Sequence, residues 1–505
     1  MAAILFYLLA TLPAGPVRVS LDGADPDLAR RTVAGAYHVH TNRSDGAGSK
    51  ADVAAAARRA GLQFVIVTDH GDGTRPPDPP EYIDSVLVID AVEISTNGGH
   101  YVALGLPQAP YPLGGDAAAV VEDVARLGGF GIVAHPDHPR GELAWSDWSL
   151  PVDGIEWINA DSEWRAEGPL AFARSLAHYL IRPAGTIAAM FDRPDTTLAR
   201  WDGLNRTRLV VGLAAVDAHG GGNRSEAHGG EGGIVFGPGY ESSFRALTNR
   251  VVLDAPFTGD ADSDASRLLA AIRGGRVFTV VDALSPDVLV AMGEGAAVRS
   301  PLPDDADVIE HREGQAARIE ILFRGADGDP PVPWVVTNWV NTPQLLGTPE
   351  LAPWGDEASP METGEWRVEH RAGSTGDLEA HEGGFVLRYE LAAGARESQY
   401  VAAASDLSGE PFTGIYFEAT ADRPTRVSVQ LRYPPDDHRW TRSVYVDGTI
   451  RTIFVPVEGL SSTDAGGRAP APAGVPRSIL FVVDLVNASP GQQGSLTIRN
   501  LRARR

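Results

Sequence analysis

Histidines and carboxylates recur in short groups in the first half of the chain. His38 and His40 stand two positions apart in AYHVHT, and Asp217 and His219 repeat that spacing in AVDAH. In a β-strand, residues two positions apart point to the same face, so each pair can direct two ligand atoms toward one ion. The spacing therefore predicts that both segments contribute to a metal site.

The other candidate ligands follow apolar runs or turns. Asp45 lies in the turn Ser-Asp-Gly, which returns a carboxylate toward the first histidine pair. The remaining candidates are His70 in VTDH, Glu93 in VEIS, His100 after Asn-Gly-Gly, and His135 in IVAHP. The chain has no cysteine, so any transition metal must be held by nitrogen and oxygen atoms. Such a ligand set suits zinc, manganese or iron, and the sequence does not choose among them.

Strands and helices alternate around these groups. We expect strands at GAYHVHT, LQFVIVTDH, SVLVIDAVEIS, HYVALGL, GFGIVAHP, GIEWIN, RLVVGLAAVDAH and RVFTVV. Ser49 and Gly61 are typical ends for a helix through KADVAAAARRA, and a second helix is expected from Asp116 to Leu127. This alternation predicts parallel strands with helical crossovers, in an α/β barrel or an open sheet. In such barrels the active site lies at the C-terminal ends of the strands, where the candidate ligands stand.

The motifs HVHTNRSDG, VTDHGD, VEISTNGGH, AHP and DAH occur in this order. Together they resemble the motif set of the polymerase and histidinol phosphatase (PHP) family over residues 35–283. The resemblance implies a distorted (β/α)7 barrel, the PHP fold, that holds two to three divalent metal ions. The first ion would be held by His38, His40, Glu93 and Asp217. Glu93 would bridge to a second ion, which His100 and His135 also bind. The third ion would be held by Asp45, His70 and His219.

A site of this kind predicts hydrolysis. Adjacent divalent ions lower the pKa of a water and stabilise negative charge on oxygens, so we expect a hydrolase that uses metal-bound hydroxide. Its expected catalytic residues are Glu93, Asp217 and His135. A phosphoesterase is the first prediction, because phosphoester hydrolysis is the commonest chemistry of the family. Carboxylic or carbamic ester hydrolysis is the alternative, because a PHP domain followed by GGRVFTVVDAL and β-domains resembles the carbaryl-hydrolase branch.

The two hypotheses require different surroundings for a small ester substrate. A phosphoesterase needs cationic groups beside the metals, whereas a carboxylic or carbamic ester hydrolase needs an apolar pocket. The candidate contacts to an anionic, phosphorylated substrate are Arg75, His138, Arg140 and His228. The candidates for an apolar lining are Trp145, Trp148, Trp157 and Trp164.

A chain of 505 residues is long enough for several domains. We expect a PHP metallohydrolase domain at 31–284, a small β subdomain at 285–341, a linker at 342–365, and a β-sandwich of the jelly-roll kind at 366–505. The last region consists of regular short strands separated by turn signals. It supports a third hypothesis, a surface- or carbohydrate-binding protein. The candidate aromatic contacts for a glycan are Tyr433, Trp440 and Tyr445.

Charge and the N-terminal segment bear on partners and location. The formal net charge is -23, so the chain has no general attraction to nucleic acids, and we expect no nucleic acid partner. Residues 1–30 contain the apolar run Ala2–Leu12, which predicts a signal peptide and leader and hence a periplasmic or extracellular protein. No basic residue precedes the run, so a cytoplasmic location is the alternative. The run is too short to span a bilayer, and we expect no transmembrane span.

Overall fold

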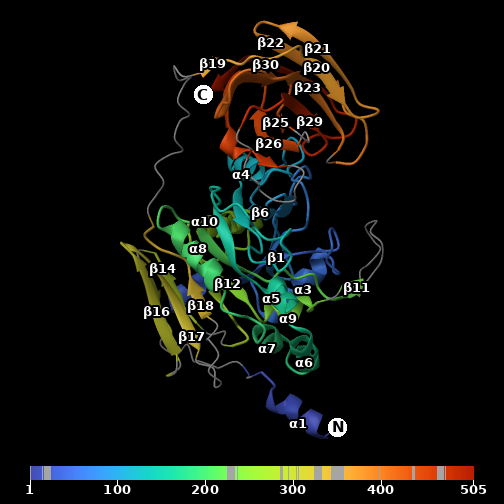
Figure 1. Ribbon diagram of the computed structural model, residues 1–505. Helices are drawn as coiled ribbons and strands as arrows, with labels where there is room; N and C mark the ends of the chain where they lie inside the picture. The colour runs from blue at the N-terminus through green and yellow to red at the C-terminus, as the bar shows by residue number, and fades with distance from the viewer. Residues whose placement is uncertain are drawn as a thin grey trace. The chain divides into compact units, whose positions relative to one another are not determined.

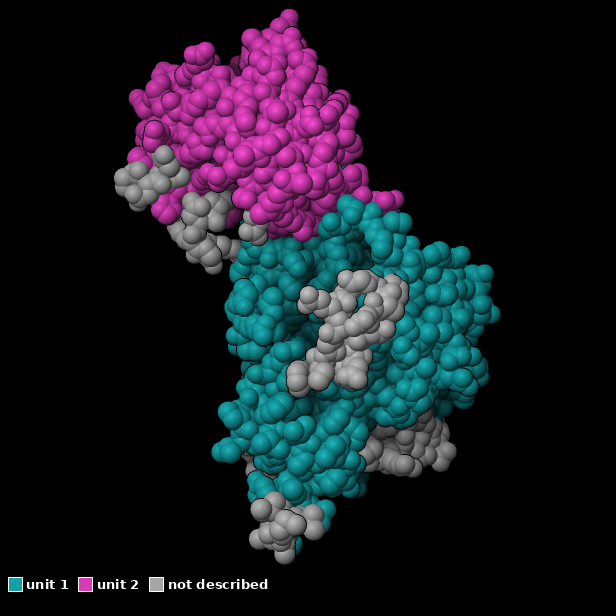
Figure 2. All heavy atoms as spheres, turned by 90° about the vertical axis from the view of Figure 1, so that its right-hand side faces the viewer, with its two compact units in different colours: residues 1–107, 121–347 teal, residues 108–120, 348–505 magenta. Residues whose placement is uncertain are grey.

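Two compact units make up the chain (Figure 2): unit 1 comprises Met1–Pro107 and Val121–Gly347, and unit 2 comprises Gln108–Val120 and Thr348–Arg505. The computed structural model describes residues 2–13, 15, 24–223, 234–235, 237–284, 288–293, 295–302, 304, 306–323, 333–342, 358–396, 398–434, 438–462, 471 and 474–505. Most of the expected linker, 343–357, lies outside the described residues.

The larger sheet of unit 1 is mixed. Its strand order is β16-β17-β18-β13-β12-β1-β2-β4-β3. The strands are β1 Thr32–Val39, β2 Phe64–Val67, β3 Glu81–Ile83, β4 Val86–Asp90, β12 Thr248–Val252, β13 Val277–Val280, β16 Ala306–Glu313, β17 Ala316–Phe323 and β18 Pro333–Thr337. β1, β2 and β4 pair in parallel, whereas β12 runs antiparallel to β1.

The second sheet of unit 1 carries the remaining strands near the candidate ligands. It consists of β5 Val92–Thr96, β6 Gly99–Leu104, β7 Phe130–Val133, β8 Gly154–Asn159 and β9 Val211–Ala215. β7, β8 and β9 are parallel, but β5–β6 and β6–β7 are antiparallel, which departs from the predicted parallel order. Only Asn97 and Gly98 separate β5 from β6, and parallel strands need a much longer crossover.

Two isolated parallel bridges connect the sheets of unit 1. One joins His70, after β2, to Glu93 in β5, and the other joins Val39 to Ala218, after β9. A single apolar core also spans both sheets, with members such as Phe64, Ile132 and Leu213. The candidate ligands therefore stand where the two sheets meet.

The two predicted helices are present in the described chain. α3, Lys50–Ala60, begins with a capping box formed by Ser49 and Asp52 and ends at Gly61, whose φ of 83° suits glycine. α4 is Ala117–Arg126. The other helices are α1 Ala2–Ala10, α2 Pro26–Arg31, α5 Ala160–Ala166, α6 Pro169–Tyr179, α7 Pro183–Ala188, α8 Asp195–Asn205, α9 Tyr240–Phe244 and α10 Ala261–Arg273 (Figure 1). Small hairpins are formed by β10 Gly222–Asn223 with β11 Ile234–Val235, and by β14 Val290–Met292 with β15 Ala296–Val298.

None of the helices in the described part of the chain has both the length and the apolar character needed to cross a membrane. The expected signal peptide stays a prediction.

Unit 2 is built on strands, as predicted for the C-terminal region. One sheet has the order β21-β22-β30-β24-β27 with β19 beside β30, and the other has the order β20-β23-β29-β25-β26-β28. The strands are β19 Ala358–Pro360, β20 Arg367–His370, β21 Thr375–His381, β22 Gly384–Glu390, β23 Tyr400–Asp406, β24 Gly414–Ala421, β25 Thr425–Tyr433, β26 His438–Val446, β27 Arg451–Pro456, β28 Ser461–Ser462, β29 Ser478–Asp484 and β30 Gln493–Arg504, with the 3-10 turn η1 Val457–Gly459. One core unites apolar residues of both sheets, including Phe417, Phe481 and Leu496.

A short segment from the first half of the sequence also belongs to unit 2. Within Gln108–Val120, the carbonyl of Pro112 accepts a hydrogen bond from Asn487, and the carbonyl of Ala119 accepts one from Arg426. Division of the sequence into consecutive domains does not predict that this segment belongs to unit 2, because the segment has no linker-like composition.

Candidate metal centre

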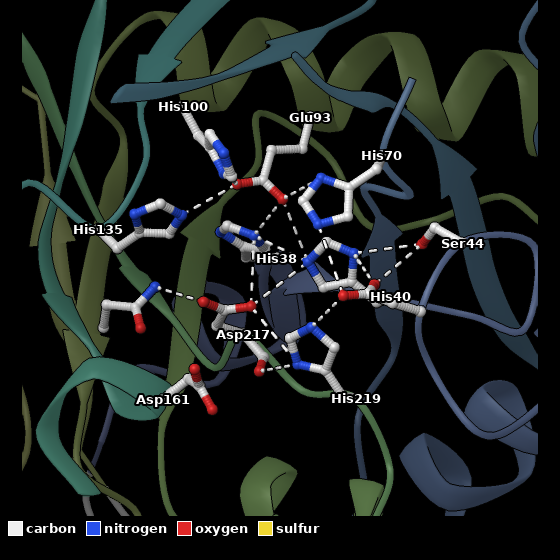
Figure 3. Close-up of polar contacts among 12 residues, drawn as sticks. His38, His40, Ser44, His70, Glu93, His100, His135, Asp161, Asp217 and His219 are labelled. Atoms are coloured by element: carbon white, nitrogen blue, oxygen red, sulfur yellow. Dashed lines mark hydrogen bonds and ion pairs between the residues drawn. The ribbon is translucent and has the colours of Figure 1, made fainter. Parts of the chain in front are cut away.

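The structure brings the nine candidate ligands together, and Figure 3 labels all of them except Asp45. Three groups have ligand atoms that all lie within 4.8 Å of one another: His38, His40 and Glu93; His40, Asp45 and His219; and His70, Glu93 and His100. His40 and Glu93 each belong to two of these groups. The three groups therefore form one continuous cluster.

The carboxylate of Glu93 lies between two sets of imidazoles. Its Oε1 is 2.8 Å from Nδ1 of His100 and 3.0 Å from Nε2 of His135. Its Oε2 is 3.2 Å from Nε2 of His38 and 3.3 Å from both Nε2 of His40 and Nδ1 of His70. This geometry gives each oxygen its own set of nitrogens, as a carboxylate that bridges two ions requires.

Two further carboxylates complete the cluster. Oδ1 of Asp217 is 3.5 Å from Nε2 of His38 and 3.3 Å from Nε2 of His40. Oδ2 of Asp45 is 3.2 Å from Nε2 of His219 and 3.6 Å from Nε2 of His70. The rings of His40 and His219 stack with centroids 4.4 Å apart. His70 thus lies near both Asp45 and Glu93.

The charges of the cluster shift the pKa values of its members strongly. Burial opposes protonation of His38, but Asp217, Glu156 and Glu93 outweigh it and raise the pKa of this imidazole well above its usual range. Against the same burial, bonds to Asp217 and Glu93 raise the pKa of His40 to about 10. The histidines in turn hold the pKa of Glu93 well below its usual range, although burial raises it. The raised pKa values of His38 and His40 favour their protonated forms when no metal is bound, and a metal ion would displace protons from these two imidazoles.

The backbone is strained at three of the ligands. His38, His135 and Asp217 have φ angles of 66°, 28° and 43°, in a region that non-glycine residues avoid at a cost of about 1–3 kcal/mol each. The pairing of β1 with β2 shifts register between Tyr37 and Val39, so His38 sits at an irregularity of the strand. The Nε2 atoms of His38 and His40 lie 3.1 Å apart at this irregularity, rather than on a regularly alternating strand.

A buried nitrogen also lacks a partner. Nδ1 of His135 has no hydrogen-bond partner among the described residues. Buried polar atoms are normally satisfied by a hydrogen bond or an ion. The nitrogen and oxygen donors, their proximity, the strained backbone and this nitrogen all fit a centre for divalent metal ions.

Glu156 on β8 supports the cluster and was missed in the sequence. Its side chain is fully buried, and Oε1 lies 2.5 Å from Nδ1 of His38. Its Oε2 accepts hydrogen bonds from the backbone N–H of His135 at 2.7 Å and from Asn159 at 2.9 Å. Asn159 also donates to Asp217 at 3.2 Å. The available signal was an acidic residue inside the apolar run GIEWIN.

Residues around β1 fix the turn that carries Asp45. Asp69 accepts hydrogen bonds from Thr41 and from Ser44, which lies next to Asp45. A Cβ at residue 46 would lie 2.3 Å from the carbonyl oxygen of His40, so only glycine fits there. The hydroxyl of Tyr240 donates to that same oxygen at 2.8 Å.

The predicted substrate contacts have different surroundings. The Arg75 guanidinium binds Asp90 and lies 3.0 Å from Asp78, so its charge is already compensated. His138 is buried with its ring 5.3 Å from that of His135, and burial together with His135 lowers its pKa. Arg140 is exposed. His228 lies outside the described residues.

Comparisons with known proteins identify no family. No family model matches the sequence, and no curated protein matches it. Among solved structures, the chain is similar to a family 11 carbohydrate-binding module from Clostridium thermocellum, with 14% identity, a TM-score of 0.24, and coverage of 29% of this chain and 94% of the module. A mutant of a family 29 carbohydrate-binding module gives 14% identity, a TM-score of 0.17, and coverage of 28% of this chain and 91% of the module. The low TM-scores mean that these likenesses do not bear on function.

Proposed function

We propose that unit 1 is a metal-dependent hydrolase of ester bonds. The single observation that carries the proposal is the set of three overlapping ligand groups, with five imidazoles and the carboxylates of Glu93 and Asp45, together with His135 and Asp217 beside them. Two to three divalent ions of zinc, manganese or iron suit these donors. We also propose that the two sheets of unit 1 form a distorted (β/α)7 barrel of the PHP kind, which the two parallel bridges and the shared core support.

The ions, when bound, supply a water of lowered pKa and stabilise negative charge on the reacting oxygens. Glu93, with one oxygen toward each set of imidazoles, fixes the spacing of the groups that hold them. Asp217 is held by Asn159, and His135 is held at its backbone by Glu156, so both side chains are positioned before substrate binds. Burial of His38, His40 and Glu93 keeps bulk water from this end of the centre.

Two classes of ester remain as candidates. In the phosphoesterase proposal, the bound ions and the exposed Arg140 would meet the phosphate charge, because the Arg75 guanidinium is already paired with Asp90 and Asp78. The same observation favours the second candidate, a carboxylic or carbamic ester, which brings no such charge. The glycan-binding hypothesis for unit 2 stays a prediction, and two of its candidate aromatics, Tyr433 and Trp440, are buried and pack edge to face.

The test uses the full-length protein loaded with zinc, manganese or iron. Metal content is measured by mass spectrometry, and hydrolysis is measured with p-nitrophenyl phosphate, bis-p-nitrophenyl phosphate and phenyl N-methylcarbamate. We expect bound metal and at least one activity, both of which disappear in Glu93→Gln. A protein that binds no metal, or an activity unchanged in Glu93→Gln, would overturn the proposal.

A further inference from the structure

An apolar hollow of about 260 Å³ is lined by residues of α5, α6 and α7. It is lined by Trp164, Phe172, Leu176, Tyr179, Met190 and Pro238, among others. A narrow cleft lined by Asp217 and His219 shares Trp164, Gly237 and Pro238 with this hollow. The hollow therefore adjoins the side of the centre that carries these two candidate ligands.

Three polar side chains of the lining, those of Trp164, Tyr179 and Thr186, already have partners. The indole N–H of Trp164 donates to Asp161 at 2.8 Å. The hydroxyl of Tyr179 bonds Ser242 at 2.6 Å and accepts from the backbone N–H of Gly239 at 2.9 Å. The hydroxyl of Thr186 donates to the carbonyl of Arg182. Apart from the Ser175 hydroxyl, the side chains of the lining therefore present mainly aromatic faces and aliphatic groups to a ligand.

The ring of Trp164 is fixed before any ligand arrives. The Arg165 guanidinium lies 4.6 Å from its ring centroid, and Phe172 stacks on it at 5.9 Å. Phe172 and Leu176 are nevertheless 42% and 60% exposed. Fixed aromatic walls with exposed apolar edges favour an apolar ligand, which would remove these edges from water.

We propose that this hollow binds an uncharged apolar group, the size of one aromatic ring, that the substrate carries next to its ester bond. The proposal rests on the proposed ester hydrolysis. Its occupant follows from the position of the hollow next to the candidate metal centre: a group in the hollow leaves the adjoining ester bond on the side of Asp217 and His219. The same apolar group is compatible with a phosphate or a carboxylic ester, and the experiment separates them.

The first arm measures binding without catalysis. Full-length protein without metal is titrated with 4-fluorotoluene, and binding is followed by 19F NMR. We expect binding that weakens about fivefold in Leu176→Ser and in Phe172→Ser, because each removes apolar surface from the lining. Leu180→Ser is the matched control, since Leu180 is 84% exposed at the end of the same helix and is not part of the lining. Binding of 4-fluorotoluene that is unchanged in both lining variants would overturn the proposal.

The second arm compares phenyl with methyl esters on the metal-loaded protein, as acetates and as phosphates. We expect Leu176→Ser to lower kcat/KM for the phenyl ester about fivefold and to leave the methyl ester unchanged. Whichever pair is hydrolysed identifies the reacting group. An equal fall for both esters would overturn the proposal. Leu176-dependent binding of 4-fluorotoluene without hydrolysis of any ester would support the hollow and reject the hydrolase.

Discussion

Two clusters of charged side chains in the described part of unit 1, each with buried members, differ in whether their polar atoms are already paired. In the candidate metal centre, imidazoles and carboxylates crowd together, and all of these groups can offer lone pairs to a cation once the imidazoles have lost their additional protons. The second cluster, which we call the arginine cluster, consists of Arg193, Asp202, Arg318 and Glu320. There the guanidinium of Arg318 donates to both oxygens of Asp202 at 2.7 and 2.8 Å and also binds Glu320. Arg193 binds the same Glu320 carboxylate.

The two clusters also differ in their backbone conformation and in their contacts with aromatic rings. In the described chain, three metal-centre residues have positive φ angles, and no member of the arginine cluster does. The guanidinium of Arg318 lies 5.5 Å from the ring centroid of Trp201 and 5.7 Å from that of Trp339. Donors and acceptors are matched in the arginine cluster, so it needs no further ion. The comparison teaches that a buried charged cluster indicates a ligand when it holds an excess of lone pairs on a strained backbone.

The largest expected effect tests the metal centre. Glu93→Gln should abolish stoichiometric metal binding and lower ester hydrolysis by about three orders of magnitude, because the charge stabilisation by the ions is lost. Metal content and kcat/KM are the measurements. Glu320→Gln serves as the control and should keep its metal. Equal metal loss in both variants would contradict the distinction between the clusters.

The arginine cluster should matter for stability instead. Glu320→Gln removes the charge of the buried carboxylate that Arg193, Arg318 and His311 share, and we expect the free energy of unfolding to fall by about 3 kcal/mol. Urea denaturation of the full-length protein measures the change. A loss below about 1 kcal/mol would contradict a structural role for the cluster.

A smaller effect is expected for Glu156, whose carboxylate contacts the candidate ligand His38. Glu156→Gln keeps the shape of the side chain but weakens its bond to His38, so metal affinity should fall about 10- to 100-fold without unfolding the protein. Metal titration against a competing chelator measures the affinity, and circular dichroism checks the fold. Glu313→Gln, at an exposed ion pair with Arg206, is the matched control. An affinity equal to that of the control would reject the positioning role.

The smallest effect concerns a buried carboxylate that is not held by an arginine pair. In unit 2, burial raises the pKa of Asp484 from 3.8 to about 6. The folded state thus binds this proton more tightly than the unfolded state, so the contribution of Asp484 to stability falls as the pH rises from about 4 to 6. Asp484→Asn should therefore stabilise the protein at pH 8 by about 1 kcal/mol and have little effect below pH 4. Thermal unfolding at both pH values is the measurement, and equal shifts would contradict it.

Much of the candidate site could be predicted from local sequence. The pairs His38–His40 and Asp217–His219, the turn at Asp45 and the capped helix α3 depend on residues a few positions apart. Such neighbours constrain one another through backbone geometry, so their spacing is informative. The antiparallel course of β5, β6 and β7 was also readable in principle, because the turn between β5 and β6 is too short for a crossover.

Contacts between segments far apart in the sequence could not be predicted from it. Glu156 lies 118 positions from His38, and only the pairing of strands places its carboxylate against that imidazole. The hollow beside Asp217 forms only where α5, α6 and α7 pack together. Of the four candidate tryptophans, Trp164 lines this hollow, whereas Trp145 and Trp157 are buried.

The sequence by itself determined which residue types stand at the strand ends, and with them the donor chemistry of the candidate centre. Only the tertiary structure decided how the carboxylate of Glu93 is shared and how Glu156 is placed. It also decided that Gln108–Val120 belongs with the C-terminal strands. The physical reason is that donor chemistry is a property of single side chains, whereas these arrangements follow from burying apolar strands and helices together across the whole chain.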